Sequence, residues 1–284
     1  YKIDFSKPIH IHFIGIGGIS MSGLAEILLK EGFTVSGSDT KESPLTKKLV
    51  SEGAHIIYGQ KVENITRDIG CVVYTAAINR NNPELIEAVA LKIPMLTRAE
   101  LLGQLMKNYD TPIAVSGTHG KTTTTSMISH ILLEGDLDPT ISVGGILKAI
   151  GGNIRVGNSG TFITEACEYT NSFLHFFPKI SVILNIEEDH LDFFKDLEDI
   201  RHSFHQFAEL LPEDGTLIIN AEIKDYAEIY EGLSCNVVTY GTNGCFDYSA
   251  KNITYDENGH VAFDLFRRGE YADHIQLSVT GDHN

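Results

Sequence analysis

The chain has 284 residues, of which 42% are hydrophobic and 21% charged, a composition typical of a globular protein with one large or two ordinary domains. Its formal net charge of −16 argues against nonspecific binding to nucleic acid or to an anionic membrane surface. No apolar run approaches the length of about 18 residues that a transmembrane helix needs, and the cysteines form no CxxC pair. We therefore expect no membrane insertion, and free thiols in a reducing cytoplasm.

The first part of the chain alternates short apolar runs with helix-like segments. Strands are predicted at residues 10–14, 34–38, 55–58, 71–75 and 94–96, and helices at residues 21–30, 43–52, 83–90 and 98–107. This alternation predicts a Rossmann-like parallel sheet covered on both faces. Ligands bind such sheets at the carboxyl ends of the strands, so we expect one crevice to be lined by Gly15, Gly17, Asp39 and Thr75.

Residues 15–20, with the sequence Gly-Ile-Gly-Gly-Ile-Ser, join the first predicted strand to the first predicted helix. The acidic residue expected about 20 positions further on in a nucleotide-binding βαβ unit is Asp39. Ser20 stands where G-x-G-x-x-G has its third glycine, which weakens a dinucleotide interpretation. A glycine turn at a helix N-terminus suits the pyrophosphate of any ligand, and the alternative is a turn with a purely structural role.

A polar connector at residues 108–112 predicts a boundary between a domain of residues 1–108 and a domain of residues 109–284. Helices are predicted in the second domain at residues 122–133 and 198–211, and strands at residues 112–115, 140–143, 161–164, 182–186 and 216–220. Short alternating strands over residues 245–279 predict an added antiparallel β segment. The expected fold class is α/β: a Rossmann-like domain followed by a P-loop α/β domain.

Residues 115–123, with the sequence Val-Ser-Gly-Thr-His-Gly-Lys-Thr-Thr, predict a phosphate-binding loop between a strand and a helix. In such a loop, backbone N–H groups and the helix N-terminus hold the phosphates, while Lys121 reaches the β- and γ-phosphates and the Thr122 hydroxyl binds Mg²⁺. The spacing from Gly117 to Gly120 is shorter than in the common pattern G-x-x-x-x-G-K-[ST]. An ordinary glycine turn before a helix is the alternative.

Two predicted strands end in acidic residues that can supply oxygen ligands for Mg²⁺. Glu165 ends the strand at residues 161–164, Glu168 follows it, and the acidic cluster at residues 187–192 contains His190. Both strand ends can meet the P-loop at one edge of the sheet, so Glu165 is a predicted metal ligand, with a solvated acid as the alternative. On chemistry alone His190 is a weaker candidate, because imidazole is a poor ligand for Mg²⁺.

Taken together, these motifs resemble those of the Mur ligase family. The segments that carry the resemblance are residues 12–25, 37–39, 117–125, 165–173, 185–192 and 281–284. They stand in the family's order and spread over almost the whole chain. The family has three domains, for a UDP-sugar, for ATP and for an amino acid. The resemblance covers the first two, and we expect the third to be absent from this chain.

The resemblance implies roles for individual residues. The diphosphate of the UDP-sugar would be bound by Gly15, Gly17, Gly18 and Ser20, with Ser38, Asp39 and Thr75 near the rest of this substrate. ATP would be bound by Gly117, Thr118, His119, Gly120, Lys121, Thr122, Thr123, Asn185 and, toward the adenine, Asn284. The catalytic residues would be Lys121, Glu165 and His190, and Mg²⁺ or Mn²⁺ would be held by Thr122, Glu165 and His190.

The implied reaction joins L-alanine to the carboxylate of UDP-N-acetylmuramate in peptidoglycan biosynthesis, through an acyl phosphate made from ATP. Lys121 and Mg²⁺ would neutralise charge on the transferred phosphoryl group. The sequences Gly-Ile-Gly-Gly at residues 15–18 and Met-Ser-Gly at residues 21–23 favour this reaction over its first rival. That rival is a sister ligase that adds a tripeptide to the same sugar nucleotide. The other rivals are a P-loop nucleotide-binding module without ligase chemistry and an NAD-linked oxidoreductase. The oligomeric state stays open.

Overall fold

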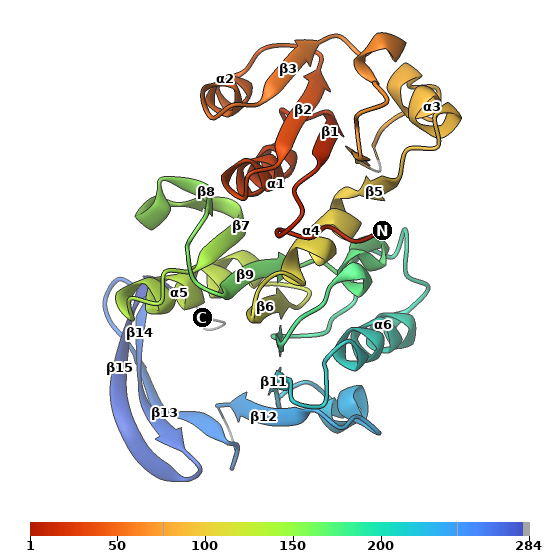
Figure 1. Ribbon diagram of the computed structural model, residues 1–284. Coiled ribbons are helices and arrows are strands. Elements are labelled where there is room, and N and C mark those ends of the chain that lie inside the picture. The colour runs from red at the N-terminus through yellow and green to blue at the C-terminus, as the bar shows by residue number, and fades with distance from the viewer. Residues whose placement is uncertain (76, 243, 281–284) are drawn as a thin grey trace. The chain divides into compact units, whose positions relative to one another are not determined.

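The computed structural model describes residues 1–75, 77–242 and 244–280. The chain forms two compact units (Figure 1). The first unit contains residues 1–109 and 139–160, and the second contains residues 110–138 and the chain from residue 161 onward. The sequence did not reveal that residues 139–160 pack with the first unit. The functional division at residue 108 stays a prediction.

The first unit is built on a parallel sheet with the strand order β3-β2-β1-β4-β5. Its strands are β1 (His10–Ile14), β2 (Thr34–Asp39), β3 (His55–Tyr58), β4 (Cys71–Tyr74) and β5 (Met95–Thr97). Its helices are α1 (Ile19–Lys30), α2 (Pro44–Ser51), α3 (Pro83–Ala90), α4 (Arg98–Met106) and the 3₁₀ helix η1 (Val62–Asn64). The order reverses between β1 and β4, which is where open α/β sheets bind ligands. The Rossmann-like prediction is confirmed.

Three helices of this unit, α2, α3 and α4, begin where the sequence supplies a capping side chain. The side chains of Ser43 and Thr97 accept hydrogen bonds from the N–H groups three residues later, before α2 and α4. Asn82 accepts in the same way from the first turn of α3, which starts with Pro83. In Figure 1, α1 and α2 lie on one side of the sheet and α3 on the other. The central strand β1 is accordingly buried from Ile11 to Ile14, with the polar His12 among its buried residues.

A hairpin of β7 (Thr140–Leu147) and β8 (Gly152–Arg155), with the 3₁₀ helix η2 (Lys148–Ile150) at its turn, completes the first unit. It packs closely on α1, because a Cβ atom on Gly23 would lie 2.4 Å from Cγ1 of Ile154. The Lys30 ammonium donates to the carbonyl oxygen of Val156 at 2.6 Å. The strand predicted at residues 140–143 is therefore the first half of a longer antiparallel strand.

The second unit holds a mixed sheet with the strand order β15-β14-β13-β12-β11-β10-β6-β9. The parallel strands are β6 (Thr111–Ser116), β9 (Thr161–Ala166), β10 (Ile180–Ile183), β11 (Thr216–Asn220) and β12 (Asn236–Gly241). The antiparallel segment is β13 (Tyr248–Tyr255), β14 (His260–Arg267) and β15 (Glu270–Thr280). The predicted P-loop domain with an added antiparallel segment is confirmed, although β12 was not predicted.

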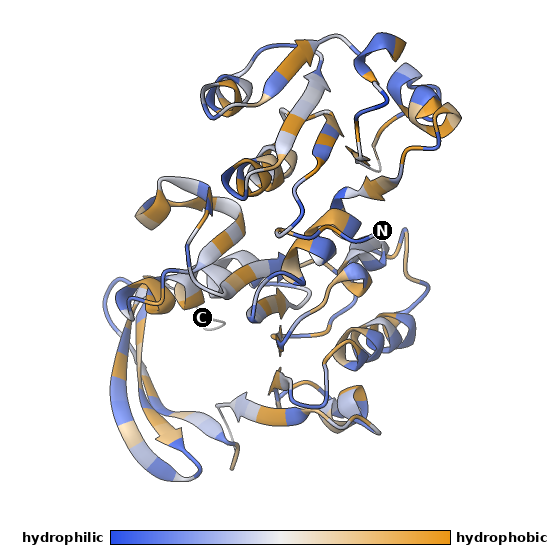
Figure 2. Cartoon of the chain, viewed as in Figure 1, coloured by the Kyte–Doolittle hydropathy of each residue, from blue (hydrophilic) through white to orange (hydrophobic). Residues whose placement is uncertain are grey.

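The helices of the second unit are α5 (Lys121–Glu134) and α6 (Leu197–Glu209), with 3₁₀ helices η3 (Tyr169–His175) and η4 (Tyr226–Tyr230). α6 buries an aromatic face, where Phe207 stacks on Phe173 with ring centroids 4.5 Å apart and Phe204 packs edge-on at 5.4 Å. Figure 2 shows polar and apolar residues interspersed along β13–β15, and most of β15 is exposed. Among the residues that the structure describes, no helix is long and apolar enough to cross a membrane.

Candidate functional site

The predicted phosphate loop connects β6 to α5, and its backbone requires glycine at two positions. Gly117 has a φ of 147° and Gly120 a φ of 81°, both in the region that L-residues avoid. A Cβ atom on Gly117 would also lie 2.9 Å from the Cβ atom of Leu184. The loop runs directly into the N-terminus of α5 at Lys121. Free N–H groups and the positive end of the helix dipole favour an anion there.

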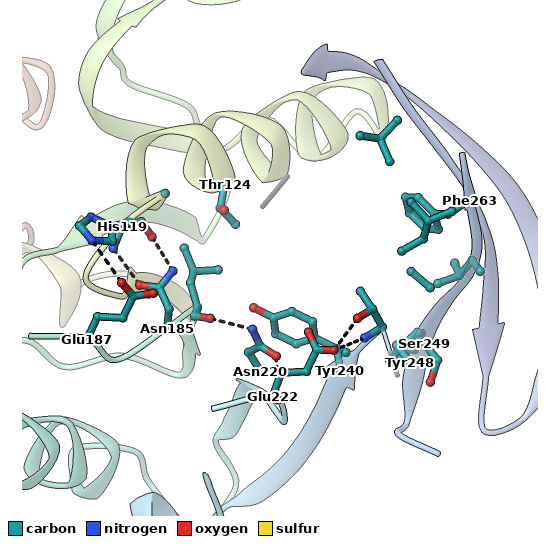
Figure 3. Close-up of a pocket in the computed structure, with 18 residues that line it drawn as sticks. His119, Thr124, Asn185, Glu187, Asn220, Glu222, Tyr240, Tyr248, Ser249 and Phe263 are labelled. Carbon is teal, nitrogen blue, oxygen red and sulfur yellow. Dashed lines mark hydrogen bonds and ion pairs between the residues drawn. The ribbon is translucent and has the colours of Figure 1, made fainter. Parts of the chain in front are cut away.

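The segment that follows β10 holds this loop in place. The Asn185 side chain accepts a hydrogen bond from the His119 N–H group at 2.8 Å and donates to the His119 carbonyl oxygen at 3.0 Å (Figure 3). The Thr118 hydroxyl accepts from the Glu187 N–H group at 2.9 Å. The Asn185 amide therefore fixes the main chain of the loop, and its predicted contact with a nucleotide stays a prediction.

The Lys121 ammonium group lies against its own loop and against one buried carboxylate. It donates to the carbonyl oxygens of Gly117 at 2.6 Å and Thr118 at 3.3 Å, and to Oε2 of Glu168 at 3.1 Å. Glu168 is only 2% exposed, and a carboxylate this buried needs a cation beside it. The sequence singled out Glu165 as the important acid of this segment, but Glu168 is the residue that contacts the lysine.

His190 reaches the same carboxylate from the other side. Its Nε2 atom is 3.8 Å from Oε1 of Glu168, and its backbone has a φ of 52°. The Tyr169 ring lies over the imidazole with centroids 4.6 Å apart and planes inclined by 34°. The Tyr169 hydroxyl donates to Asp192 at 2.8 Å, and this carboxylate raises the pKa of the Tyr169 phenol. Strand ends that are distant in sequence thus bring Lys121, Glu168 and His190 together.

The donors around Lys121 fit a magnesium ion that is also bound by phosphate. No group of three or more His, Cys, Asp or Glu side chains within the described ranges can enclose a metal by itself. Mg²⁺ is usually held by one or two carboxylates together with substrate phosphates and waters. Thr122 opens α5 beside Lys121, and Glu165 pairs with Val115 of β6. In addition, Oε1 of Glu168 is buried and accepts no hydrogen bond from any described residue.

A cavity of about 490 Å³ lies beside the loop, entirely within the second unit (Figure 3). His119, Gly120 and Asn185 form one wall of it. The ends of β11 and β12 add Asn220, Glu222 and Tyr240, and β13 and β14 add Ile253, Val261, Phe263 and Leu265. Burial, and secondarily the Glu222 carboxylate, raise the pKa of Tyr240, so its phenol stays protonated at neutral pH. Apolar walls with a few polar groups suit a flat organic ring.

The glycine turn of the first unit is anchored on the end of β2. The Gly15 and Ile16 N–H groups donate to the Ser38 carbonyl oxygen at 2.9 and 3.0 Å, and the Gly17 N–H group donates to Oδ2 of Asp39 at 2.7 Å. A Cβ atom on Gly17 would lie 2.6 Å from that carboxylate oxygen. The turn therefore brings together the predicted residues after β1 and β2. Gly18 caps α1, and Ser20 lies in its first turn.

Ser38 has a buried role that the sequence did not suggest. Its hydroxyl donates to Oε2 of Glu84 at 2.5 Å, and Nδ2 of Asn64 donates to Oε1 of Glu84 at 2.5 Å. The His12 imidazole lies 3.7 Å from the same carboxylate, and both side chains are 0% exposed. The Ser38 hydroxyl is thus engaged inside the protein, and its predicted contact with a nucleoside stays a prediction.

The remaining predicted residues are placed as follows. Thr75 directly follows β4, across the point where the strand order reverses. Thr123 lies in the first turn of α5. Asn284, with the rest of residues 281–284, lies outside the described residues. The functional candidates that sequence reasoning missed are Tyr169 and the cavity residues of β11–β14, and Glu168 was named only as a possible oxygen ligand, without its contact with Lys121. A signal was present for Tyr169 only, because it stands inside the acidic motif at residues 165–173.

Comparison with known sequence families accounts for nearly the whole chain. Residues 10–110 match the profile described as Mur ligase family, catalytic domain, and residues 115–284 match the profile described as Mur ligase middle domain. The chain belongs to the Mur ligase family. Curated Mur ligases similar to it include the UDP-N-acetylmuramate–L-alanine ligases of Agathobacter rectalis, 63% identical over 284 residues, and Lachnospira eligens, 59% identical over 285 residues. The alignments cover 100% of this chain and 62% of each relative.

Solved structures of Mur ligases resemble both units. A UDP-N-acetylmuramate:L-alanyl-γ-D-glutamyl-meso-diaminopimelate ligase from Neisseria meningitides has a TM-score of 0.84 at 28% identity, covering 98% of this chain and 90% of that one. The UDP-N-acetylmuramate–alanine ligase of Thermotoga maritima has a TM-score of 0.79 at 28% identity, covering 97% of this chain and 62% of that one. The chain spans 62% of the length of the two curated ligases from Agathobacter rectalis and Lachnospira eligens, which is less than two thirds.

Proposed function

We propose that the full-length protein is an ATP-dependent ligase that joins L-alanine to the carboxylate of UDP-N-acetylmuramate. The observation that carries this proposal is the position of Lys121, at the end of a loop that requires glycine and beside a buried carboxylate. Relatives 59–63% identical along the whole chain are named for this reaction, which supports the choice of substrates. In this proposal, the present chain supplies the ATP-binding and UDP-sugar-binding units.

The second unit would bind ATP. The N–H groups of residues 117–120 and the start of α5 hold the phosphates, and the cavity beside His119 takes the nucleoside. Tyr240 and the apolar residues of β13 and β14 offer surface for a base to stack on. Thr122, Glu165, Glu168 and His190 would hold Mg²⁺, which supplies positive charge against the β- and γ-phosphates when it is bound. Mn²⁺ has the same ligand preferences.

The first unit would bind the UDP-sugar at the glycine turn. The turn sits at the carboxyl ends of β1 and β2, next to the point where the strand order reverses, which is the usual place for a dinucleotide or sugar nucleotide. The N-terminus of α1, capped by Gly18, favours the diphosphate. Asp39 fixes the turn through Gly17 and can also accept hydrogen bonds from ribose hydroxyls.

The reaction needs activation of the carboxylate, because oxide is too poor a leaving group for an amine to displace. The carboxylate oxygen attacks the γ-phosphorus of ATP, and ADP leaves. The amine of L-alanine then attacks the acyl carbon, loses a proton, and expels phosphate. Lys121 stabilises the negative charge on the phosphoryl oxygens during the first step. Glu168, which contacts Lys121, and His190, which lies beside Glu168, would hold the Mg²⁺ whose positive charge lets the carboxylate and ATP approach each other.

The test uses the full-length protein with UDP-N-acetylmuramate and MgATP, and measures phosphate release with L-alanine or with a tripeptide as the amine. Release that requires L-alanine supports the proposal. Release with the tripeptide instead favours the sister ligase, a candidate because of the resemblance to the Neisseria enzyme. Lys121→Ala should abolish release. No binding of UDP-N-acetylmuramate at millimolar concentration in calorimetry would favour a nucleotide-binding module without ligase chemistry.

A further inference from the structure

The Lys121 ammonium group has a full set of hydrogen-bond partners within the chain itself. An ammonium group has three N–H donors, and three oxygens surround this one: those of Gly117, Thr118 and Glu168, at 2.6, 3.3 and 3.1 Å. The side chain is 16% exposed. A phosphate that takes up Lys121 must therefore take it from these oxygens, and the charged partner among them is Glu168.

Glu168 cannot lose this partner without a replacement. It is 2% exposed, and its other oxygen accepts no hydrogen bond from the described part of the chain. A buried carboxylate left alone is strongly destabilising, much more so than an exposed one. Among the described residues, the one other basic side chain within 4 Å of it is His190, at 3.8 Å. When Lys121 turns to a phosphate, this carboxylate faces the site with its charge uncompensated.

We propose that Glu168 is a positioning residue that exchanges Lys121 for a divalent cation when nucleotide binds. Without nucleotide, Glu168 holds Lys121 and competes with phosphate for it. With nucleotide and metal, Glu168 releases Lys121 to the phosphates and is compensated by the cation, on the side where His190 lies. This inference rests on the proposed binding of ATP. Its consequence is that Glu168 makes the binding of nucleotide depend on metal.

The experiment measures the dissociation constant of a non-hydrolysable ATP analogue for this chain by calorimetry, with EDTA and then with saturating Mg²⁺. Glu168→Gln keeps the shape of the side chain but ends the competition for Lys121. We expect metal-free binding to become tighter by about tenfold, and the gain in affinity from Mg²⁺ to shrink by about the same factor, which is within the usual range of coupling between sites. The matched control is Glu188→Gln, which removes an exposed charge from the acidic cluster at residues 187–192 and should change either value less than about twofold.

A second variant separates the competition for Lys121 from the negative charge of the carboxylate. Glu168→Asp keeps the negative charge but withdraws the carboxylate from Lys121 by one methylene group. It should tighten metal-free binding while it keeps most of the gain from Mg²⁺. Circular dichroism during thermal unfolding checks that each variant is folded, and the aspartate variant carries the test if the glutamine variant is not.

The results discriminate between this inference and the proposed function. If the unsubstituted chain binds no analogue even with Mg²⁺, the assignment of an ATP site is wrong. If it binds the analogue, but both Glu168 variants bind it without metal as weakly as the unsubstituted chain or more weakly, only the exchange by Glu168 is overturned.

Discussion

Asn185→Ala should loosen the phosphate loop without removing any group that the loop itself offers to a phosphate. The side chain makes two hydrogen bonds to the main chain of His119, at 2.8 and 3.0 Å. Each such bond contributes about 0.5–1.5 kcal/mol net, so the pair is worth roughly 1–3 kcal/mol. Because His119 is exposed, water can replace part of this hydrogen bonding. We therefore expect a loss in the lower half of that free-energy range.

The lost free energy appears as weaker nucleotide binding, because in the variant the loop becomes ordered only when the phosphates bind. About 1–2 kcal/mol corresponds to a dissociation constant that rises roughly 5- to 30-fold. The assay is calorimetric titration of this chain with a non-hydrolysable ATP analogue and Mg²⁺. Hydrogen exchange should show faster exchange at the His119 amide, whose acceptor is lost. Asn252→Ala, which removes an exposed side-chain contact with Asp264 on β14, is the control.

A dissociation constant within twofold of the unsubstituted chain, with unchanged exchange at His119, would refute this reasoning. Asn185→Asp refines the result. Its carboxylate can still accept from the His119 N–H group but repels the His119 carbonyl oxygen, so binding should weaken at least as much as in the alanine variant.

Four further outcomes follow from the first unit. Gly17→Ala places a methyl group 2.6 Å from the Asp39 carboxylate, so calorimetry should show UDP-N-acetylmuramate binding weakened at least about tenfold while binding of the ATP analogue is kept. Ser38→Ala leaves the buried Glu84 without one hydrogen bond and should lower the free energy of unfolding in urea by about 1–3 kcal/mol. Burial raises the pKa of Cys71 from 9.0 to about 12, so the thiol should react with DTNB at pH 8 only after unfolding. Because the unfolded thiol ionises at the lower pH, this residue should also make the protein less stable as the pH rises above about 9.

Much of the phosphate site could be predicted because it is local in sequence. Gly117, Gly120 and Lys121 lie within one turn between a strand and a helix, and the backbone angles that the two glycines adopt are those the motif requires. The glycine turn after β1 was predictable for the same reason. The alternation of strands and helices likewise predicted the parallel strands of both sheets, because a helix that connects two strands lets them lie parallel in one sheet.

The charged contacts of the site depend on tertiary packing and were not predictable. Glu165 and Glu168 are both acids near the end of β9, and no local pattern says which one turns toward Lys121. Glu168 directly precedes the 3₁₀ helix η3, in which Thr170 and Asn171 have positive φ. Glu84, the hydrogen-bond partner of Ser38, lies 46 residues away in sequence, and no periodic pattern in the sequence predicts this contact. The cavity also brings residues of the β13–β14 hairpin together with the phosphate loop, which lies far from that hairpin in sequence.

The most direct test of the central claim is an isotope transfer with the full-length protein. UDP-N-acetylmuramate labelled with ¹⁸O in its carboxylate is incubated with L-alanine and MgATP, and the released phosphate is analysed by mass spectrometry. If an acyl phosphate forms, one labelled oxygen passes from the carboxylate to each phosphate that is released with the amide product. Amide product accompanied by unlabelled phosphate, or phosphate released without amide product, would contradict the proposed ligase reaction.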